Sequence, residues 1–147
     1  MGARLYLRSA AVLTLLLGVG HMLGKPWVPA NDLGATVVAA AMKSHSMHVM
    51  GFDRTLMDFY GGFGLILGVN LLAEAALLWL VADLVSSDAT RARRIAAVLF
   101  VMNAAVTVLS ALYLFTAPLL FSAGVTLCLG AAVLAPRRPG ARVFKGM

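Results

Sequence analysis

The sequence predicts an all-α fold: an integral membrane four-helix bundle with an additional interfacial helix in a long first connection. Of its 147 residues, 61% are hydrophobic and 12% are charged, against roughly 45–50% and about 25% in soluble domains. The charged residues are also confined to a few short segments that separate long apolar stretches. This pattern excludes a soluble globule and a disordered chain. We expect a single membrane domain over residues 1–147.

The uncharged stretches predict four membrane spans. From Arg94 to Arg137 no residue is charged, and as one helix this stretch would be about 63 Å long, twice a hydrocarbon core of roughly 30 Å. It therefore holds two helices, and Pro118 marks the turn between them because proline starts a helix more easily than it continues one. The predicted spans are 5–24, 57–82, 95–115 and 118–135.

The first span could instead be a cleaved secretory signal. Arg4 and Arg8 precede its apolar core, and Val28-Pro29-Ala30 resembles a small-residue cleavage site. Polar residues intervene, however, and Pro29 stands just before the residue where cleavage would occur. We therefore expect a retained helix.

The basic residues predict the orientation of the spans. Most of the 12 Lys and Arg residues flank the cytoplasmic ends of a topology with an even number of spans. We expect a multi-pass protein of the cell inner membrane with both termini in the cytoplasm. Membrane lipids, anionic headgroups near the C-terminal tail in particular, are the expected partners. A nucleic-acid partner is not expected, since the basic residues are split among separate segments. The nine basic residues at the cytoplasmic ends are Arg4, Arg8, Arg91, Arg93, Arg94, Arg137, Arg138, Arg142 and Lys145.

The first connection, residues 25–56, is too long for a simple loop. Trp27 suits the headgroup region, where aromatic rings accumulate. An interfacial helix is predicted over residues 33–50, capped by Asp32 and ended by Gly51. Asp53 is expected to cap the second span.

Three histidines predict a metal site in or near this connection. His45 and His48 are three residues apart, which on a helix places both rings on one face. His21, at the outer end of the first span, could approach them. Imidazoles bind zinc or copper, and nearby methionines would suit cuprous copper. Alternatively, the histidines form hydrogen bonds at the headgroups while the methionines fill packing gaps.

Buried polar residues form a second group of candidates. Glu74 lies near the middle of the second span, where an ionisable group is costly, and Asn70 precedes it by one turn. Asn103 begins a polar stripe on the third span that continues through Thr107 and Ser110. The stripe could face Glu74 and supply hydrogen-bond donors, either for proton exchange or to keep the helices in register.

Two GxxxG pairs predict close helix packing, because small residues at this spacing let two backbones approach. One pair is Gly20 with Gly24, and the other is Gly64 with Gly68.

Residues 50–65 read MGFDRTLMDFYGGFGL, with Gly20-His21 upstream and Trp79 near the end of the second span. This block resembles a group of small, uncharacterised bacterial four-helix membrane proteins carrying MGxxRTxxDFYxGFGL, and the likeness covers roughly the first 80 residues. In size and helix count alone the chain is also similar to the DoxX-like proteins. The resemblance implies no activity, but it directs attention to polar residues that accompany the block.

We therefore expect one composite site at the outer ends of the first two spans, beneath the 33–50 helix. A carboxylate, imidazoles, a guanidinium and a phenol could bind a lipid headgroup, a quinone-like molecule or a metal, and could act as acid and base. One alternative is a small proton-coupled exporter that uses Glu74. Another is a non-catalytic subunit that docks on a larger membrane partner or forms a homodimer. Neither an enzymatic reaction nor a particular cofactor is indicated. The candidate catalytic residues are His21, His45, Arg54, Asp58 and Tyr60.

Overall fold

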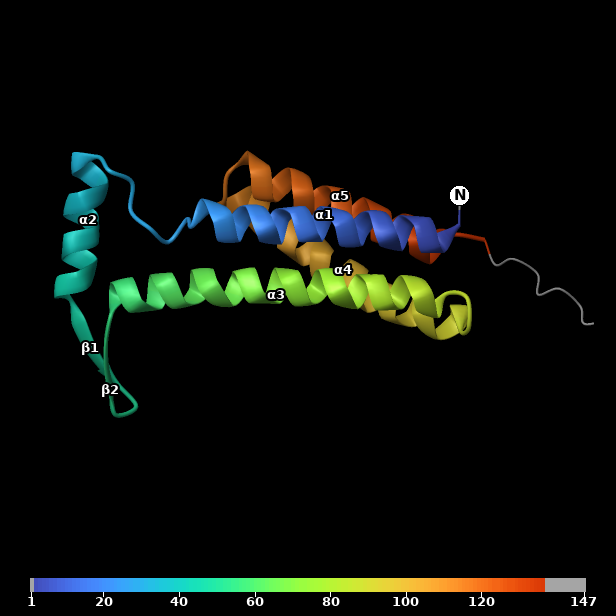
Figure 1. Ribbon diagram of the computed structural model, residues 1–147, viewed down its shortest axis with the longest axis horizontal. Helices are drawn as coiled ribbons and strands as arrows, with labels where there is room; N and C mark the ends of the chain where they lie inside the picture. The colour runs from blue at the N-terminus through green and yellow to red at the C-terminus, as the bar shows by residue number, and fades with distance from the viewer. Residues whose placement is uncertain (1, 137–147) are drawn as a thin grey trace, which may run out of the picture. The chain divides into compact units, whose positions relative to one another are not determined.

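A computed structural model describes residues 2–136 of the chain. Within these residues, four helices are long and apolar enough to cross a membrane, which confirms the predicted all-α, multi-pass membrane fold. A short helix and a two-stranded hairpin lie between the first two of them (Figure 1). The elements are α1 (Ala3–Gly24), α2 (Leu33–Ser44), β1 (Ser46–Val49), β2 (Phe52–Thr55), α3 (Leu56–Leu84), α4 (Ala89–Tyr113) and α5 (Thr116–Leu134).

The helices α4 and α5 start earlier than the uncharged stretches predict. The side chain of Asp88 accepts a hydrogen bond from the backbone N–H of Arg91 at 2.8 Å and caps α4. Because of this cap, α4 begins at Ala89 rather than at residue 95, and its first turns include arginines. Pro118 lies in the first turn of α5, where its missing N–H costs no helical hydrogen bond.

The predicted interfacial helix over residues 33–50 is wrong in its second part. Asp32 caps α2 as expected, accepting from the Ala35 N–H at 2.8 Å, but α2 ends at Ser44. The strands β1 and β2 then pair in antiparallel register, with Val49 opposite Phe52. Met50 and Gly51 form the two-residue turn, and both have positive φ, +50° and +86°. This is the geometry of a hairpin turn, so Gly51 turns a hairpin instead of ending a helix.

The predicted cap of the second span is also corrected. Asp53 lies within β2. The cap of α3 is a reciprocal pair, in which Thr55 Oγ1 accepts from the Asp58 N–H at 3.1 Å and Asp58 Oδ2 accepts from the Thr55 N–H at 2.8 Å. This is a capping box, in which a hydroxyl and a carboxylate three residues apart satisfy two otherwise unpaired N–H groups.

Two compact units make up the chain, and the long helices α1 and α3 each contribute to both. The core unit comprises Met1–Leu13 and Leu77–Met147. Its buried cluster takes three residues from each of the four long helices, several of them alanines, which let helices pack closely. The two last helices, α4 and α5, pack against each other along their length. The cluster consists of Leu7, Ala10, Ala11, Leu78, Val81, Ala82, Ala92, Ala96, Leu99, Val125, Leu129 and Ala132.

The connection unit comprises residues 14–76. Its glycines confirm one of the two predicted GxxxG pairs. A Cβ on Gly64 would lie 2.6 Å from Cε3 of Trp27, and one on Gly68 would collide with Met22. By contrast, a Cβ on Gly20 or Gly24 would meet nothing within 4 Å. The closest approaches therefore involve Gly64 and Gly68 on α3, and α1 adds one at Gly18, where a Cβ would lie 3.1 Å from the Cβ of Leu71.

Candidate functional site

His21 holds the end of α1 against α3. Its ring nitrogen Nε2 lies 2.8 Å from the carbonyl oxygen of Gly64, and because a carbonyl only accepts, Nε2 carries the proton and donates. The indole of Trp27 lies beside the imidazole, with ring centroids 5.4 Å apart. The imidazole of His21 is thus half-buried and serves as an anchor.

Tyr60 provides a second anchor for the chain that leaves α1. Its hydroxyl donates to the carbonyl oxygen of Pro26 at 2.7 Å. The Trp27 ring also packs against Gly64, so this bond and this contact together attach residues 26–27 to α3. The phenol that the sequence suggested for acid–base work therefore positions the first connection.

Asp58, a third candidate, is likewise occupied. One of its oxygens accepts hydrogen bonds from both the backbone N–H and the hydroxyl of Thr55, at 2.8 and 2.9 Å. Arg54 and Asp58 are four residues apart in the sequence, a spacing that allows an ion pair on a helix, but no ion pair joins them within residues 2–136. The Arg54 guanidinium instead lies 5.4 Å from the ring centroid of Phe52 and donates to the Asp53 carbonyl oxygen.

The hairpin has two chemically different faces, because residues paired across its strands point to the same side. One face is polar: it carries Ser46 opposite Thr55 and His48 opposite Asp53. His48 Nδ1 lies 2.8 Å from Asp53 Oδ1, and both side chains are exposed. This pair is a surface ion pair when His48 is protonated.

The other face of the hairpin is apolar except for one arginine. It carries Met47 opposite Arg54 and Val49 opposite Phe52. The side chain of Phe52 is 60% exposed, and Met50 at the tip is 95% exposed. Met47, Val49 and Phe52 therefore share this face with a guanidinium that makes no ion pair within the described chain.

The helix α2 continues this exposed apolar character. Of its residues only Ala39 is buried, and Leu33, Val37 and Val38 are exposed. Figure 1 shows the hairpin extending from the end of α2 and returning to the first turn of α3. His45 lies at this junction: its backbone N–H bonds to the Ala41 carbonyl and its own carbonyl accepts from Leu56 at 3.4 Å.

The predicted metal site is not assembled. His45 and His48 do not share a helical face, because α2 ends before them. Within residues 2–136 no group of three or more His, Cys, Asp or Glu side chains lies close enough to hold a metal ion. The three histidines have separate positions. His21 on α1 donates to a carbonyl of α3, His48 on β1 bonds to Asp53, and His45 is exposed at the end of α2.

The predicted buried polar residues divide into three cases. The expectation for Asn70 is wrong, since its side chain is exposed. Glu74 is half-buried within α3. Asn103 is buried as predicted, and its Nδ2 donates to the Leu99 carbonyl at 3.0 Å. Thr107 donates to the Asn103 carbonyl, and its hydroxyl oxygen lies 3.0 Å from that of Thr126 on α5. The polar stripe therefore joins α4 to α5.

Sequence reasoning missed the apolar face of the hairpin, although a signal was present. Residues 46–49 alternate polar and apolar, as a half-exposed strand does, and a two-residue segment ending in Gly51 follows them. This alternation places Phe52 beside Arg54 and Asp53 beside His48. Chemically, the arrangement combines a stacked guanidinium with apolar contact surface, which suits an amphiphile better than a reaction.

Comparison of the chain with protein-family models, with curated proteins and with solved structures finds no match.

Proposed function

We propose that this membrane protein binds a phospholipid through its first connection, at the interface on the outer side of the membrane that it spans. In this proposal Arg54 binds the phosphate of the headgroup. The observation that carries the proposal is the apolar face of the hairpin, where Arg54 stands among Met47, Val49 and Phe52. A guanidinium stacked on an aromatic ring is well suited to a phosphate oxygen, which it can bind through two parallel N–H groups.

Exposed apolar side chains support the interfacial position of this connection. Met50, Phe52 and the outward residues of α2 are costly in water and favourable among lipid tails. At 12 residues, α2 is about 18 Å long and too short to cross a bilayer. An apolar helix of this length therefore lies along the interface, with the hairpin beside it.

The anchors of the connection support a binding role rather than a catalytic one. His21 on α1, and Asp58 and Tyr60 on α3, each use one polar atom in a contact within the protein. They hold the connection in place, so Arg54 and the apolar face remain as the groups that can meet a ligand. The basic residues at the opposite ends of the spans support a position of this connection on the outer side of the membrane.

The position of the hairpin is tested with a fluorescent label. An environment-sensitive fluorophore is attached to Met50→Cys in a Cys128→Ser background, and the full-length protein is placed in phosphatidylcholine nanodiscs. We expect blue-shifted emission that spin-labelled lipids quench. The matched control is Ser46→Cys on the polar face, which should emit as in water. Water-like emission from the label at position 50 would contradict the proposal.

The role of Arg54 is tested by native mass spectrometry of the protein released from the same nanodiscs. Arg54→Gln should lower phosphatidylcholine retention about tenfold, because a charge-assisted hydrogen bond to phosphate is lost. Lys43→Gln removes the same charge from α2 and should leave retention within about twofold. Equal retention by the two variants would rule out Arg54 as the phosphate ligand.

A further inference from the structure

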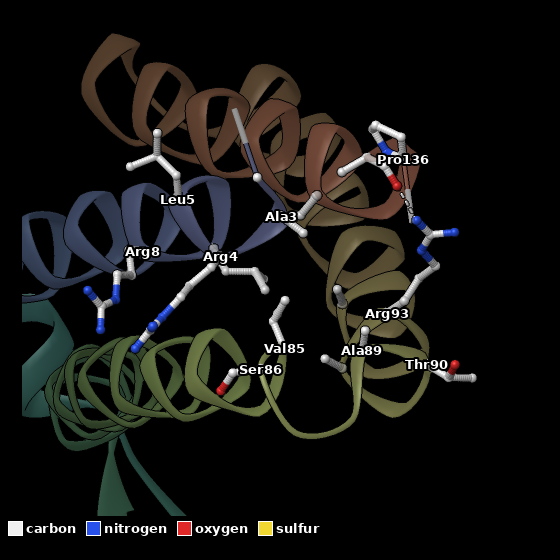
Figure 2. Close-up of a pocket in the computed structure, with 16 residues that line it drawn as sticks. Ala3, Arg4, Leu5, Arg8, Val85, Ser86, Ala89, Thr90, Arg93 and Pro136 are labelled. Carbon is white, nitrogen blue, oxygen red and sulfur yellow. Dashed lines mark hydrogen bonds between the residues drawn. The ribbon is translucent and has the colours of Figure 1, made fainter. Parts of the chain in front are cut away.

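The core unit contains a pocket at its basic end, which we define as the first turns of α1, the α3–α4 connection, the start of α4 and the end of α5. The pocket has a volume of about 1030 Å³. Figure 2 shows the side chains around it, contributed by α1, by residues 85–86, by α4 and by the residues that end α5. Every lining residue belongs to the core unit.

Three arginines line this pocket, and the described lining includes neither Asp nor Glu. Arg4 and Arg8 extend from α1 toward α3, whereas Arg93 extends from α4 toward Pro136 (Figure 2). The guanidiniums therefore stand on different sides of the pocket. Its walls carry an excess of positive charge, which attracts an anion.

The contacts that these arginines already make leave part of their charge available. The Arg8 guanidinium lies 5.0 Å from the centroid of the Trp79 ring, and Arg93 donates to the Ala135 carbonyl oxygen. A single oxygen of Asp83 accepts from Arg4 at 2.7 Å and from Arg8 at 3.2 Å. Each guanidinium has five N–H donors, so one shared oxygen satisfies few of them. In addition, the Nε of Arg8 is buried and has no hydrogen-bond partner within the described chain.

Other walls of the pocket are apolar. They include Leu5, Leu7 and Val85, with small alanines on α4 and α5 between them. Hydrocarbon can contact such walls without removing water from a polar group. A ligand that satisfies the whole pocket therefore combines a phosphate with an apolar body.

We propose that this pocket binds an acidic phosphate ester, which Arg4 and Arg8 contact from one wall and Arg93 from another (Figure 2). An acidic phospholipid and a soluble phosphate share this chemistry, since both offer oxygens that guanidinium groups bind in pairs. The site differs from the proposed outer site in its residues and in its compact unit, so either proposal can fail while the other stands.

The test measures lipid affinity with the full chain in phosphatidylcholine nanodiscs, using a fluorescent phosphatidylglycerol as the probe. Arg4→Gln and Arg93→Gln should each weaken binding of the probe about tenfold. The control is Arg94→Gln, which removes the same charge from the same turn of α4 at an exposed residue outside the pocket. Its effect should stay within about twofold, as for general attraction between surface charges and the membrane.

A competition arm separates the two phosphate sources. If inorganic phosphate displaces the fluorescent lipid from the wild type, the site accepts soluble phosphate. If only unlabelled phosphatidylglycerol displaces it, the site is specific for the lipid. Equal loss of affinity in Arg4→Gln, Arg93→Gln and Arg94→Gln, or no loss in any of them, would overturn the proposal.

Folding defects are distinguished by two further measurements. Circular dichroism and the Tm of each variant report whether the helices form. Where Arg4→Gln or Arg93→Gln unfolds, the corresponding lysine variant keeps the charge and loses the paired N–H geometry. Binding that is weakened in a folded lysine variant supports the proposal, and wild-type binding in both lysine variants contradicts it.

Discussion

In the first connection, single polar contacts hold an otherwise exposed chain, whereas in the core unit a buried cluster of closely packed alanines and leucines holds the helices together. His21, Tyr60 and Thr55 each make one or two bonds that fix a segment of the connection unit. The core unit instead buries three residues from each long helix in one cluster. Stability in the connection unit is therefore local, while in the core unit it is shared among neighbours. A substitution in the connection unit should therefore affect only its own segment, whereas one in the core unit should lower the stability of the whole unit.

The largest loss of stability is expected in the core unit. Leu129 is 0% exposed in the buried cluster, so Leu129→Ala should lower the free energy of unfolding by about 2–5 kcal/mol through the cavity it leaves. Denaturant titration in detergent measures the loss. Leu127→Ala on the same helix is the control, because Leu127 is 74% exposed. Equal losses for the two variants would contradict the distributed packing described above.

A smaller and more local effect is expected at Gly64. In Gly64→Ala the new Cβ would meet the Trp27 ring, and overpacking of this kind typically costs about 1–3 kcal/mol. Fluorescence of Trp27 in a Trp79→Phe background should shift as the indole moves. Gly61→Ala adds a methyl group to the same helix in open space and should leave the emission unchanged. An unchanged Trp27 emission in Gly64→Ala would show that the indole does not depend on this contact.

The smallest effect is expected at the cap of α3. Thr55→Ala removes one half of the capping box and should cost about 1 kcal/mol. Hydrogen exchange of the Asp58 amide should accelerate, while exchange in the core unit stays constant. Ser46→Ala, opposite Thr55 in the hairpin, is the control for removal of a hydroxyl. If the Asp58 amide exchanges at the wild-type rate, the cap is not what protects it.

Hydropathy and charge predicted the membrane fold because they indicate whether a segment is more stable in lipid or in water. This preference decides whether a long helix crosses the membrane. The four spans follow from uncharged stretches, with limits shifted by caps that use short-range hydrogen bonds. At Asp88 the shift is largest: the cap extends α4 over arginines that composition alone assigns to a loop.

Local backbone geometry was harder to predict. The sequence Met50-Gly51 can end a helix or turn a hairpin, and only the pairing of residues 46–49 with 52–55 decides between them. Likewise, Asp53 and the Thr55–Asp58 pair are both reasonable caps for α3. The pair prevails because Asp53 is engaged in β2, where it meets His48.

Candidate site residues were identified by type, but their partners were not. A polar residue in an apolar segment indicates a specific contact, but the sequence does not identify the partner of that contact. His21 and Tyr60 both make such contacts, and both donate to backbone carbonyls. Because every residue has a backbone carbonyl, the sequence cannot show which one is the acceptor. Asn70 shows the converse, because the rotation of a helix that is apolar on every side cannot be read from its pattern.

The bonds of Arg4 and Arg8 to Asp83 also constrain the order in which the protein assembles during synthesis. These partners are 79 and 75 residues apart in the chain, whereas α4 and α5 are consecutive helices that contact each other directly. Contacts between neighbouring helices close short loops and form early, and contacts across long separations form late. The α4–α5 pair can therefore mature as a unit soon after it leaves the ribosome. The start of α1, although synthesised before the other three long helices, completes its packing last, because half of the buried cluster that it joins comes from α4 and α5, which are made after α3.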